Sequence, residues 1–118
     1  MDASLSHADG CVVCAASAEA RVGVDVERLD RAPQIEGVMT RVFAPEEIAA
    51  LERLPRAERG AAMTRLWSLK EAYAKALGLG LGLDFRRIAF GPAPWRGAVG
   101  LDRRRAARGW RFEAEALA

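Results

Sequence analysis

The stretch RAERGAAMTRLWSLKEAYAKAL, residues 56–77, decides the fold of this chain. Its apolar side chains recur at three- and four-residue spacing, which is typical of an amphipathic helix packed on a core. This stripe consists of Ala62, Leu66, Leu69, Tyr73, Ala76 and Leu77. Gly78 follows in the position of a left-handed helix cap. We therefore predict one long helix from about Arg56 to Leu77 and a flexible glycine-rich loop over 78–82.

Short strand patterns lie on both sides of this helix. Residues 11–17 are apolar and partly β-branched, and residues 22–27 (VGVDVE) place valine at every second position, the mark of a half-buried strand. We expect these two segments to form an antiparallel hairpin closed by residues 17–21. Further strands are expected after the helix, with turn signals between them, at 85–90, 98–101 and 110–115.

A shorter helix is expected before the long one. Pro45 fits a first helical turn, and the glutamates behind it suit the positive end of the helix dipole. Ile48 and Leu51 give this helix an apolar face, and Pro55 ends it. Residues 28–37 resemble a loop. The order of strand pair, helices and strand meander indicates an α+β fold, with an antiparallel β-sheet packed against the long helix.

Composition limits the class of protein. The chain has 118 residues, of which 51% are hydrophobic, so we expect one domain over 1–118 with one core. A net charge of +2 is low for a protein that grips nucleic acid. Residues 1–10 have neither the pattern of a signal peptide nor that of a membrane anchor, so we expect a soluble, cytoplasmic protein. We interpret Cys11 and Cys14 as core cysteines whose sulfurs point to opposite faces of a strand.

Two carboxylates on the second strand pattern are candidate metal ligands. Residues i and i+2 of a strand share a face, so Asp25 and Glu27 should point outward together while Val24 and Val26 face the core. Two carboxylates so close repel each other unless a cation lies between them, and Mg²⁺ prefers such hard oxygen ligands. The alternative is a plain solvated strand face, which this pattern alone favours.

The long helix carries a second group of candidates. Arginine supplies nearly all the basic residues, and the two lysines, Lys70 and Lys75, both fall on this helix. Two ammonium groups here indicate weakly a site that needs them, although chance explains them as well. Glu71 and Lys75 form either a simple helix pair or a carboxylate and a cation of a site. His7 is either an ordinary surface histidine or a phosphate contact.

Taken in order, three motifs resemble the 4′-phosphopantetheinyl transferases of the Sfp type. They are Ser4-Leu5-Ser6-His7, then Gly23-Val24-Asp25-Val26-Glu27, then Trp67-Ser68-Leu69-Lys70-Glu71-Ala72 with Lys75 and Gly78. The resemblance covers about Ser4 to Phe90. It implies transfer of 4′-phosphopantetheine from coenzyme A to a serine of an apo acyl or peptidyl carrier protein, with release of 3′,5′-bisphosphoadenosine.

The resemblance also implies residue roles. Asp25, Glu27 and Glu71 would bind Mg²⁺, and Glu71 would also take the proton of the attacking serine. Lys70 and Lys75 would contact phosphates, with Lys75 assisting the leaving nucleotide. Ser6 and His7 would meet the nucleotide end of coenzyme A. Trp67 matches a motif position, and we assign it to packing.

The match has a boundary. Sfp-type enzymes resemble two similar halves, and this sequence corresponds to the second. The small holo-acyl-carrier-protein synthases have about this length but lack the Ser-His loop. We therefore expect a half that is truncated, forms a homo-oligomer or awaits a partner half. A non-catalytic binder of coenzyme A or of a carrier protein is one alternative. A nucleic-acid module is another, which the even charge balance disfavours; its arginine cluster is Arg103, Arg104, Arg105, Arg108 and Arg111.

Overall fold

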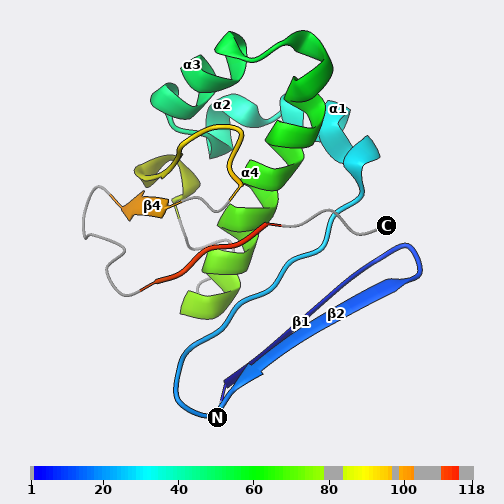
Figure 1. Ribbon diagram of the computed structural model, residues 1–118, viewed down its shortest axis with the longest axis vertical. Helices are drawn as coiled ribbons and strands as arrows, with labels where there is room; N and C mark the ends of the chain where they lie inside the picture. Colours follow the sequence, from blue (N-terminus) through cyan, green and yellow to red (C-terminus); the bar gives the residue numbers. More distant parts are fainter. Residues whose placement is uncertain (1, 79–83, 97–98, 103–109, 115–118) are drawn as a thin grey trace.

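A long helix, α4, forms the axis of the fold (Figure 1). The structure is a computed structural model that describes residues 2–78, 84–96, 99–102 and 110–114. Helix α4 spans Arg56–Leu77, as predicted, and ends at Gly78, whose φ of 70° is the left-handed cap conformation. The predicted apolar stripe is confirmed, because Ala62, Leu66, Leu69 and Tyr73 are buried. Of the glycine-rich loop over 78–82, residues 79–82 lie outside the described residues.

Short helices precede α4 and cover its N-terminal part. They are the 3₁₀ turn η1 (Leu29–Arg31) and the helices α1 (Ala32–Glu36), α2 (Met39–Val42) and α3 (Pro45–Arg53). The helix at Pro45 was predicted, but the loop expected over 28–37 is wrong. Pro33 lies in the first turn of α1, where a missing N–H costs nothing, and Ile35 anchors the helix in the core.

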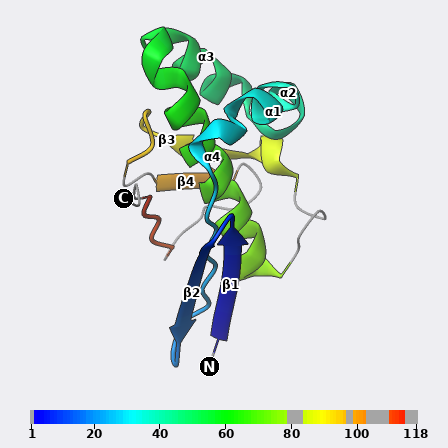
Figure 2. The same ribbon diagram turned by 90° about the vertical axis from the view of Figure 1, so that its right-hand side faces the viewer.

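The N-terminal hairpin differs from the predicted one. Strand β1 (Asp2–Ala8) pairs antiparallel with β2 (Cys11–Ser17) across a turn at Asp9 and Gly10, which have φ values of 36° and 81°. Strand β2 was expected, but its partner was predicted to be 22–27. The hairpin lies to one side of α4 (Figure 2).

Residues 21–28, the connecting segment, run extended between the hairpin and α4 (Figure 1). They form no regular strand, so that prediction is wrong in its pairing. Side-chain oxygens of β1 replace a backbone ladder: the N–H groups of Val22, Val24 and Val26 donate to Asp2 Oδ2, Ser4 Oγ and Ser6 Oγ at 2.7, 3.1 and 3.1 Å. The period-two pattern was real, but the partners are side chains.

A second small antiparallel sheet follows α4. A 3₁₀ turn, η3 (Phe85–Arg87), leads into β3 (Ile88–Gly91), which pairs with β4 (Val99–Asp102). The strand expected over 110–115 is not formed in its described part, 110–114. Trp110 and Phe112 instead stack edge to face on Tyr73 at centroid distances of 5.3 and 5.5 Å. The class is α+β with antiparallel sheets beside one long helix, as predicted.

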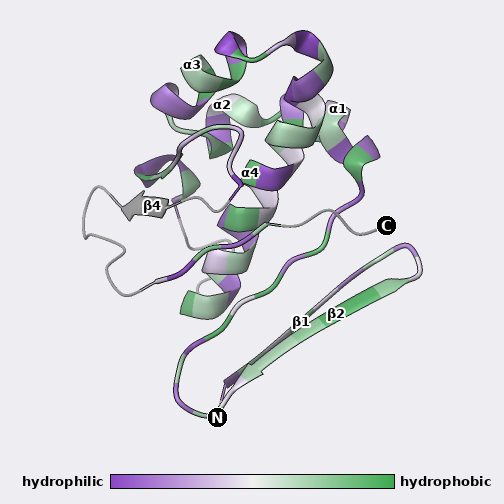
Figure 3. Cartoon of the chain, in the orientation of Figure 1, coloured by the Kyte–Doolittle hydropathy of each residue, from purple (hydrophilic) through white to green (hydrophobic). Residues whose placement is uncertain are grey.

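Hydrophobic residues occur along the hairpin (Figure 3), and every second residue of each strand is exposed on its outward face. Leu5 and Val12 are 62% and 68% exposed. Cys14 lies on this face, so its assignment to the core is wrong, while Cys11 on the opposite face is half-buried. The helices in the described part of the chain are all too short or too polar to cross a membrane.

Candidate functional site

The connecting segment lies against α4 at unusually close range. A Cβ built on Gly23 would stand 1.9 Å from the carbonyl oxygen of Ala72 and 2.9 Å from the Cβ of Ala76. Only glycine permits this approach. The approach places the next residues, Asp25 and Glu27, beside the helix face that carries Ser68, Glu71 and Lys75.

Asp25 and Glu27 face α4 rather than solvent. Their side chains are only 7% and 14% exposed. Val24 and Val26, expected in the core, are half-buried. The prediction that the carboxylates point outward is therefore wrong, because the segment packs edge-on between the hairpin and the helix rather than as a strand of a sheet. Both carboxylates still point to the same side, as their spacing predicted.

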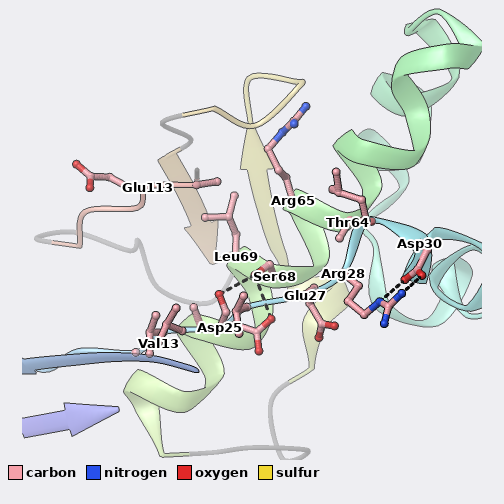
Figure 4. Close-up of a pocket in the computed structure, with 16 residues that line it drawn as sticks. Val13, Asp25, Glu27, Arg28, Asp30, Thr64, Arg65, Ser68, Leu69 and Glu113 are labelled. Carbon is pink, nitrogen blue, oxygen red and sulfur yellow. Dashed lines mark hydrogen bonds and ion pairs between the residues drawn. The ribbon is translucent and has the colours of Figure 1, made fainter. Parts of the chain in front are cut away.

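Three side chains contact the carboxylate of Asp25, and Figure 4 shows one of them, Ser68. Ser68 Oγ lies 3.0 Å from Asp25 Oδ2, to which it donates. Lys75 Nζ lies 3.2 Å from Oδ1 and also donates to the carbonyl of Val24 at 3.0 Å. Ser6 Oγ donates to Oδ1 at a longer 3.4 Å. Both oxygens of Asp25 are thus held from opposite sides.

Glu27 bridges α4 and the start of the short helices. Trp67 Nε1 donates to Glu27 Oε1 at 3.1 Å, and Arg31 lies 3.3 Å from Oε2. Trp67 also stacks on Phe85, so its assignment to packing is confirmed but incomplete. Burial, followed by the charge of Asp25, raises the pKa of Glu27, while Trp67 and Arg31 act in the opposite direction.

Glu71 lines the same pocket as these two carboxylates. We call this the polar pocket; its volume is about 600 Å³. It is lined by Asp25 and Glu27 of the connecting segment, by the hairpin, and by α4. Burial and then the charge of Asp25 raise the pKa of Glu71, and Lys75 lowers it. Glu71 is therefore close enough to Asp25 for their charges to repel, which is the arrangement that a cation would relieve.

The predicted metal ligands line one pocket but do not form a finished site. Within the described ranges, no group of three or more histidine, cysteine, aspartate or glutamate side chains is arranged to hold a metal ion. Lys75 meanwhile supplies a positive charge at Asp25. The donor set of Asp25, Glu27 and Glu71 consists of hard oxygens in one pocket, which fits the chemistry of Mg²⁺.

Ser6 and His7, the predicted nucleotide contacts, differ in how available their side chains are. Ser6 and His7 both line the polar pocket. His7 is exposed, whereas Ser6 is only 7% exposed, and its hydroxyl is already engaged by Val26 N–H and Asp25. The geometry leaves His7 open to a ligand and ties Ser6 to the protein itself.

Lys70 is not brought to the pocket, so its predicted phosphate contact is wrong. Its side chain is fully buried and lies 2.6 Å from Glu47 Oε1. Its ammonium also donates to three backbone carbonyls, those of Val42, Phe85 and Ile88, at 3.0, 2.6 and 2.7 Å. The group has no remaining proton for a phosphate, because four acceptors surround three N–H bonds.

The sequence reasoning missed two contributors to the site, Ser68 and Arg31. Ser68 stands inside the third motif, three residues before Glu71, and this helical spacing was the signal that could have found it. Arg31 lines the polar pocket. It lies within residues 28–37, predicted to be a loop, where no local pattern marks a pocket residue.

A second pocket of about 700 Å³ shares Asp25 through Arg28 with the polar pocket (Figure 4). Its other walls include Leu69 and Ala72 of α4, so it is largely apolar. Of the predicted arginine cluster, residues 103–108 lie outside the described residues. Arg111 is exposed and pairs with Glu113 at 2.7 Å.

Comparison with known proteins gives the context of this geometry. Residues 21–117 match the family model described as the 4′-phosphopantetheinyl transferase superfamily. The chain is 34% identical over 90 residues to the 4′-phosphopantetheinyl transferase HetI of Nostoc sp., an alignment that covers 75% of this chain and 38% of that protein. It is 38% identical over 101 residues to 4′-phosphopantetheinyl transferase pptA of Paxillus involutus, covering 77% of this chain and 37% of the relative.

A human relative is also similar. The L-aminoadipate-semialdehyde dehydrogenase-phosphopantetheinyl transferase of Homo sapiens is 30% identical over 97 residues, covering 77% of this chain and 31% of that protein. The chain thus spans about a third of the length of the curated relatives it matches. The family match extends over most of the chain and includes the connecting segment and α4, which carry Asp25, Glu27 and Glu71 of the polar pocket. This chain belongs to the 4′-phosphopantetheinyl transferase superfamily.

Proposed function

We propose that this chain carries out, or forms the core of, Mg²⁺-dependent transfer of 4′-phosphopantetheine from coenzyme A to a serine of an apo acyl or peptidyl carrier protein. The observation that carries the proposal is the polar pocket, in which Asp25, Glu27, Glu71 and Lys75 meet from two elements. Family membership supports the chemistry, and the pocket supports these residues as its site.

Asp25, Glu27 and Glu71 would hold the Mg²⁺ ion. The ion would neutralise charge on the pyrophosphate of coenzyme A and on the leaving oxygen. The carboxylates are suited to this task because they are partly removed from water and repel one another. Lys75 balances part of that charge now, and its side chain remains one-third exposed, so its ammonium can turn to a phosphate.

The protein's own groups supply the remaining chemistry. The hydroxyl oxygen of the carrier serine attacks the β-phosphorus of coenzyme A, and the bond to the bridging oxygen breaks. Glu71 accepts the hydroxyl proton, and a raised pKa makes its carboxylate a better base at neutral pH. Lys75 donates to a phosphate oxygen and stabilises the departing 3′,5′-bisphosphoadenosine. Holding both reactants in line supplies the rest of the rate.

The nucleotide end is proposed to lie near His7. This side chain is exposed at the edge of the polar pocket, where a neutral or charged imidazole can donate to a phosphate. Lys70 is left out of the proposal because of its buried ion pair. Ser6, first expected to touch the nucleotide, lies at the pocket with its hydroxyl already engaged.

We also propose that residues 1–118 form one domain equivalent to the second half of an Sfp-type enzyme. The chain spans 38% of the length of HetI, which agrees with one half of a longer enzyme. A complete cleft would then need a second copy or a partner half. The alternative is a half-domain that binds coenzyme A or a carrier protein without turnover.

The test is transfer of a fluorescent phosphopantetheine arm from labelled coenzyme A to an apo carrier protein, followed with and without Mg²⁺. We expect transfer that chelation of the metal abolishes. Glu71→Gln should lower the rate by about 10²-fold or more, because it removes both a base and a ligand. Glu52→Gln is the matched control, since Glu52 is an exposed glutamate on α3 that lines neither pocket.

Each outcome decides between the two candidates. Metal-dependent transfer that Glu71→Gln removes supports the enzyme. Absence of transfer at high protein concentration, together with stabilisation of the chain by coenzyme A and Mg²⁺, supports the non-catalytic binder. Absence of both transfer and ligand-induced stabilisation contradicts the proposed function altogether. The native mass, measured on the same sample, tells whether a second copy completes the cleft.

A further inference from the structure

Besides Lys75, which lies 3.2 Å from Oδ1, two serines contact the carboxylate of Asp25 and approach it from different elements. Its side chain is only 7% exposed. Ser68 of α4 holds Oδ2 at 3.0 Å, and Ser6 of β1 lies 3.4 Å from Oδ1. A carboxylate held at both oxygens cannot rotate freely about its Cβ–Cγ bond.

Ser6 is built into the protein rather than presented to solvent. Its hydroxyl oxygen accepts the N–H of Val26 at 3.1 Å, so its single proton is available to Asp25. Ser4, two residues earlier on the same strand, accepts the N–H of Val24 at the same 3.1 Å. The hydroxyl of Ser4 thus bonds to a backbone N–H and not to a carboxylate. The two serines differ mainly in whether a carboxylate lies within reach.

Ser68 connects Asp25 to the helix that carries Glu71. Ser68 and Glu71 are three residues apart on α4 and therefore share a face of the helix. Ser68 Oγ also lies 3.2 Å from the carbonyl oxygen of Asp25, so its one proton is shared between backbone and side chain of the same residue. The contact with the carbonyl holds the backbone of Asp25 against α4, and the contact with Oδ2 limits the rotation of its carboxylate.

We propose that Ser6 and Ser68 are positioning residues that hold the Asp25 carboxylate in the orientation needed to bind a divalent cation together with Glu27 and Glu71. The inference rests on the proposed function, because it concerns the same site. Mg²⁺ demands nearly ideal octahedral geometry, so a ligand that is free to rotate binds it poorly. Groups that orient a ligand through hydrogen bonds commonly change metal affinity by about 10- to 100-fold.

The experiment measures binding of Mn²⁺ alone, by electron paramagnetic resonance titration of the full chain, beside thermal unfolding of each variant. We expect Ser68→Ala and Ser6→Ala to weaken Mn²⁺ binding by about tenfold or more. Ser4→Ala is the matched control for Ser6→Ala, because it removes the same kind of backbone contact and should leave the affinity unchanged. Ser68→Thr keeps the hydroxyl at a position that lines the second pocket, so it should retain binding.

The comparison of Ser6 with Ser4 separates positioning from simple stability. Equal losses of Mn²⁺ affinity in Ser4→Ala and Ser6→Ala would overturn the role of Ser6, because both would then act through the backbone. Unchanged affinity in Ser68→Ala would overturn the role of Ser68. If the unsubstituted chain binds no Mn²⁺, the metal site of the proposed function fails first. If it binds Mn²⁺ and all variants bind equally, only the positioning inference fails.

Discussion

Two lysines on α4, five residues apart, each bind one carboxylate, yet the two pairs differ in almost every physical respect. Lys70 and Glu47 lie 2.6 Å apart with both side chains 0% exposed. Lys75 and Asp25 lie 3.2 Å apart with side chains 33% and 7% exposed. At 3.6 residues per turn the two lysines point in directions roughly 140° apart. The same residue type on one helix therefore serves the interior on one side and the pocket on the other.

The interior pair is complete. Glu47 accepts the N–H groups of Ala44 and Phe90 at 2.7 and 2.8 Å as well as Lys70. Burial raises the pKa of Glu47 and lowers that of Lys70, and their mutual attraction opposes both shifts. The carboxylate meets only donors and the ammonium only acceptors, so the geometry holds the pair in its charged form. A fully buried pair whose ammonium has no N–H left has nothing to offer a ligand.

The pocket pair is incomplete by contrast. Lys75 uses two contacts, to Asp25 and to the carbonyl of Val24, and keeps part of its surface in water. The charge of Asp25 raises the pKa of its neighbours Glu27 and Glu71. Groups that are close, charged and only partly satisfied are the ones that a ligand can reorganise. The difference indicates that degree of satisfaction, more than residue type, separates a structural charge from a functional one.

The largest effect is expected from breaking the interior pair. Lys70→Met should destabilise the fold by about 3–5 kcal/mol, because Glu47 is left buried without its counter-charge. Urea unfolding followed by circular dichroism measures the change. The double variant Lys70→Met/Glu47→Leu should recover much of the loss, since no buried charge remains. Equal stability of Lys70→Met and the unsubstituted chain would mean that the pair is not buried as described.

The next effect concerns the close approach that forms the pocket. Gly23→Ala would place a Cβ 1.9 Å from the carbonyl of Ala72, so the connecting segment must move away from α4. We expect a loss of stability of about 1–3 kcal/mol and, because Asp25 moves with the segment, a loss of metal binding. Chemical denaturation and Mn²⁺ titration report the two effects.

Gly60→Ala is the matched control for that substitution. Gly60 lies within α4, and a Cβ added to it would lie 3.5 Å from the Cβ of Ala32 in α1, an ordinary van der Waals contact. Alanine at this position should stabilise the chain by about 0.5–1 kcal/mol, because glycine is costly inside a helix. If both glycine variants changed stability in the same direction, the tight packing of Gly23 on α4 would be contradicted.

The smallest change in stability is expected at the pocket pair. Lys75→Met should alter the free energy of unfolding by less than about 1 kcal/mol, because a partly exposed ion pair contributes little. Its effect should fall on transfer of the phosphopantetheine arm, measured as in the test of the proposed function. A loss of stability as large as that of Lys70→Met would remove the distinction between the two lysines.

The sequence allowed the elements with strong local patterns to be predicted. The apolar stripe of α4, its glycine cap and Pro45 at the start of α3 all depend on residues close in the chain. The helix at 32–36 was missed because Pro33 was read as a loop signal, although proline equally opens a helix. The hairpin partner was missed because a period of two does not tell whether a segment's bonding partner is backbone or side chain.

The site followed the same division. Motif order brought Asp25, Glu27, Glu71 and Lys75 together as candidates, and they line one pocket. Lys70 was misassigned because helical spacing separates it from Lys75 without telling which of the two is buried. That depends on Glu47, which contacts Phe90 across 43 residues of chain. Such distant pairings carry no local pattern.

The bonds between β1 and the connecting segment have a consequence for how this region tolerates change. A backbone ladder forms with almost any sequence, but here every second residue of β1 must offer an acceptor oxygen: Asp2, Ser4 and Ser6. The intervening residues, Ala3, Leu5 and His7, are exposed, and their side chains are not needed as acceptors for the connecting segment. Adjacent positions on one short strand thus obey opposite substitution rules, and a saturation library of β1 should alternate between intolerance and freedom along its length.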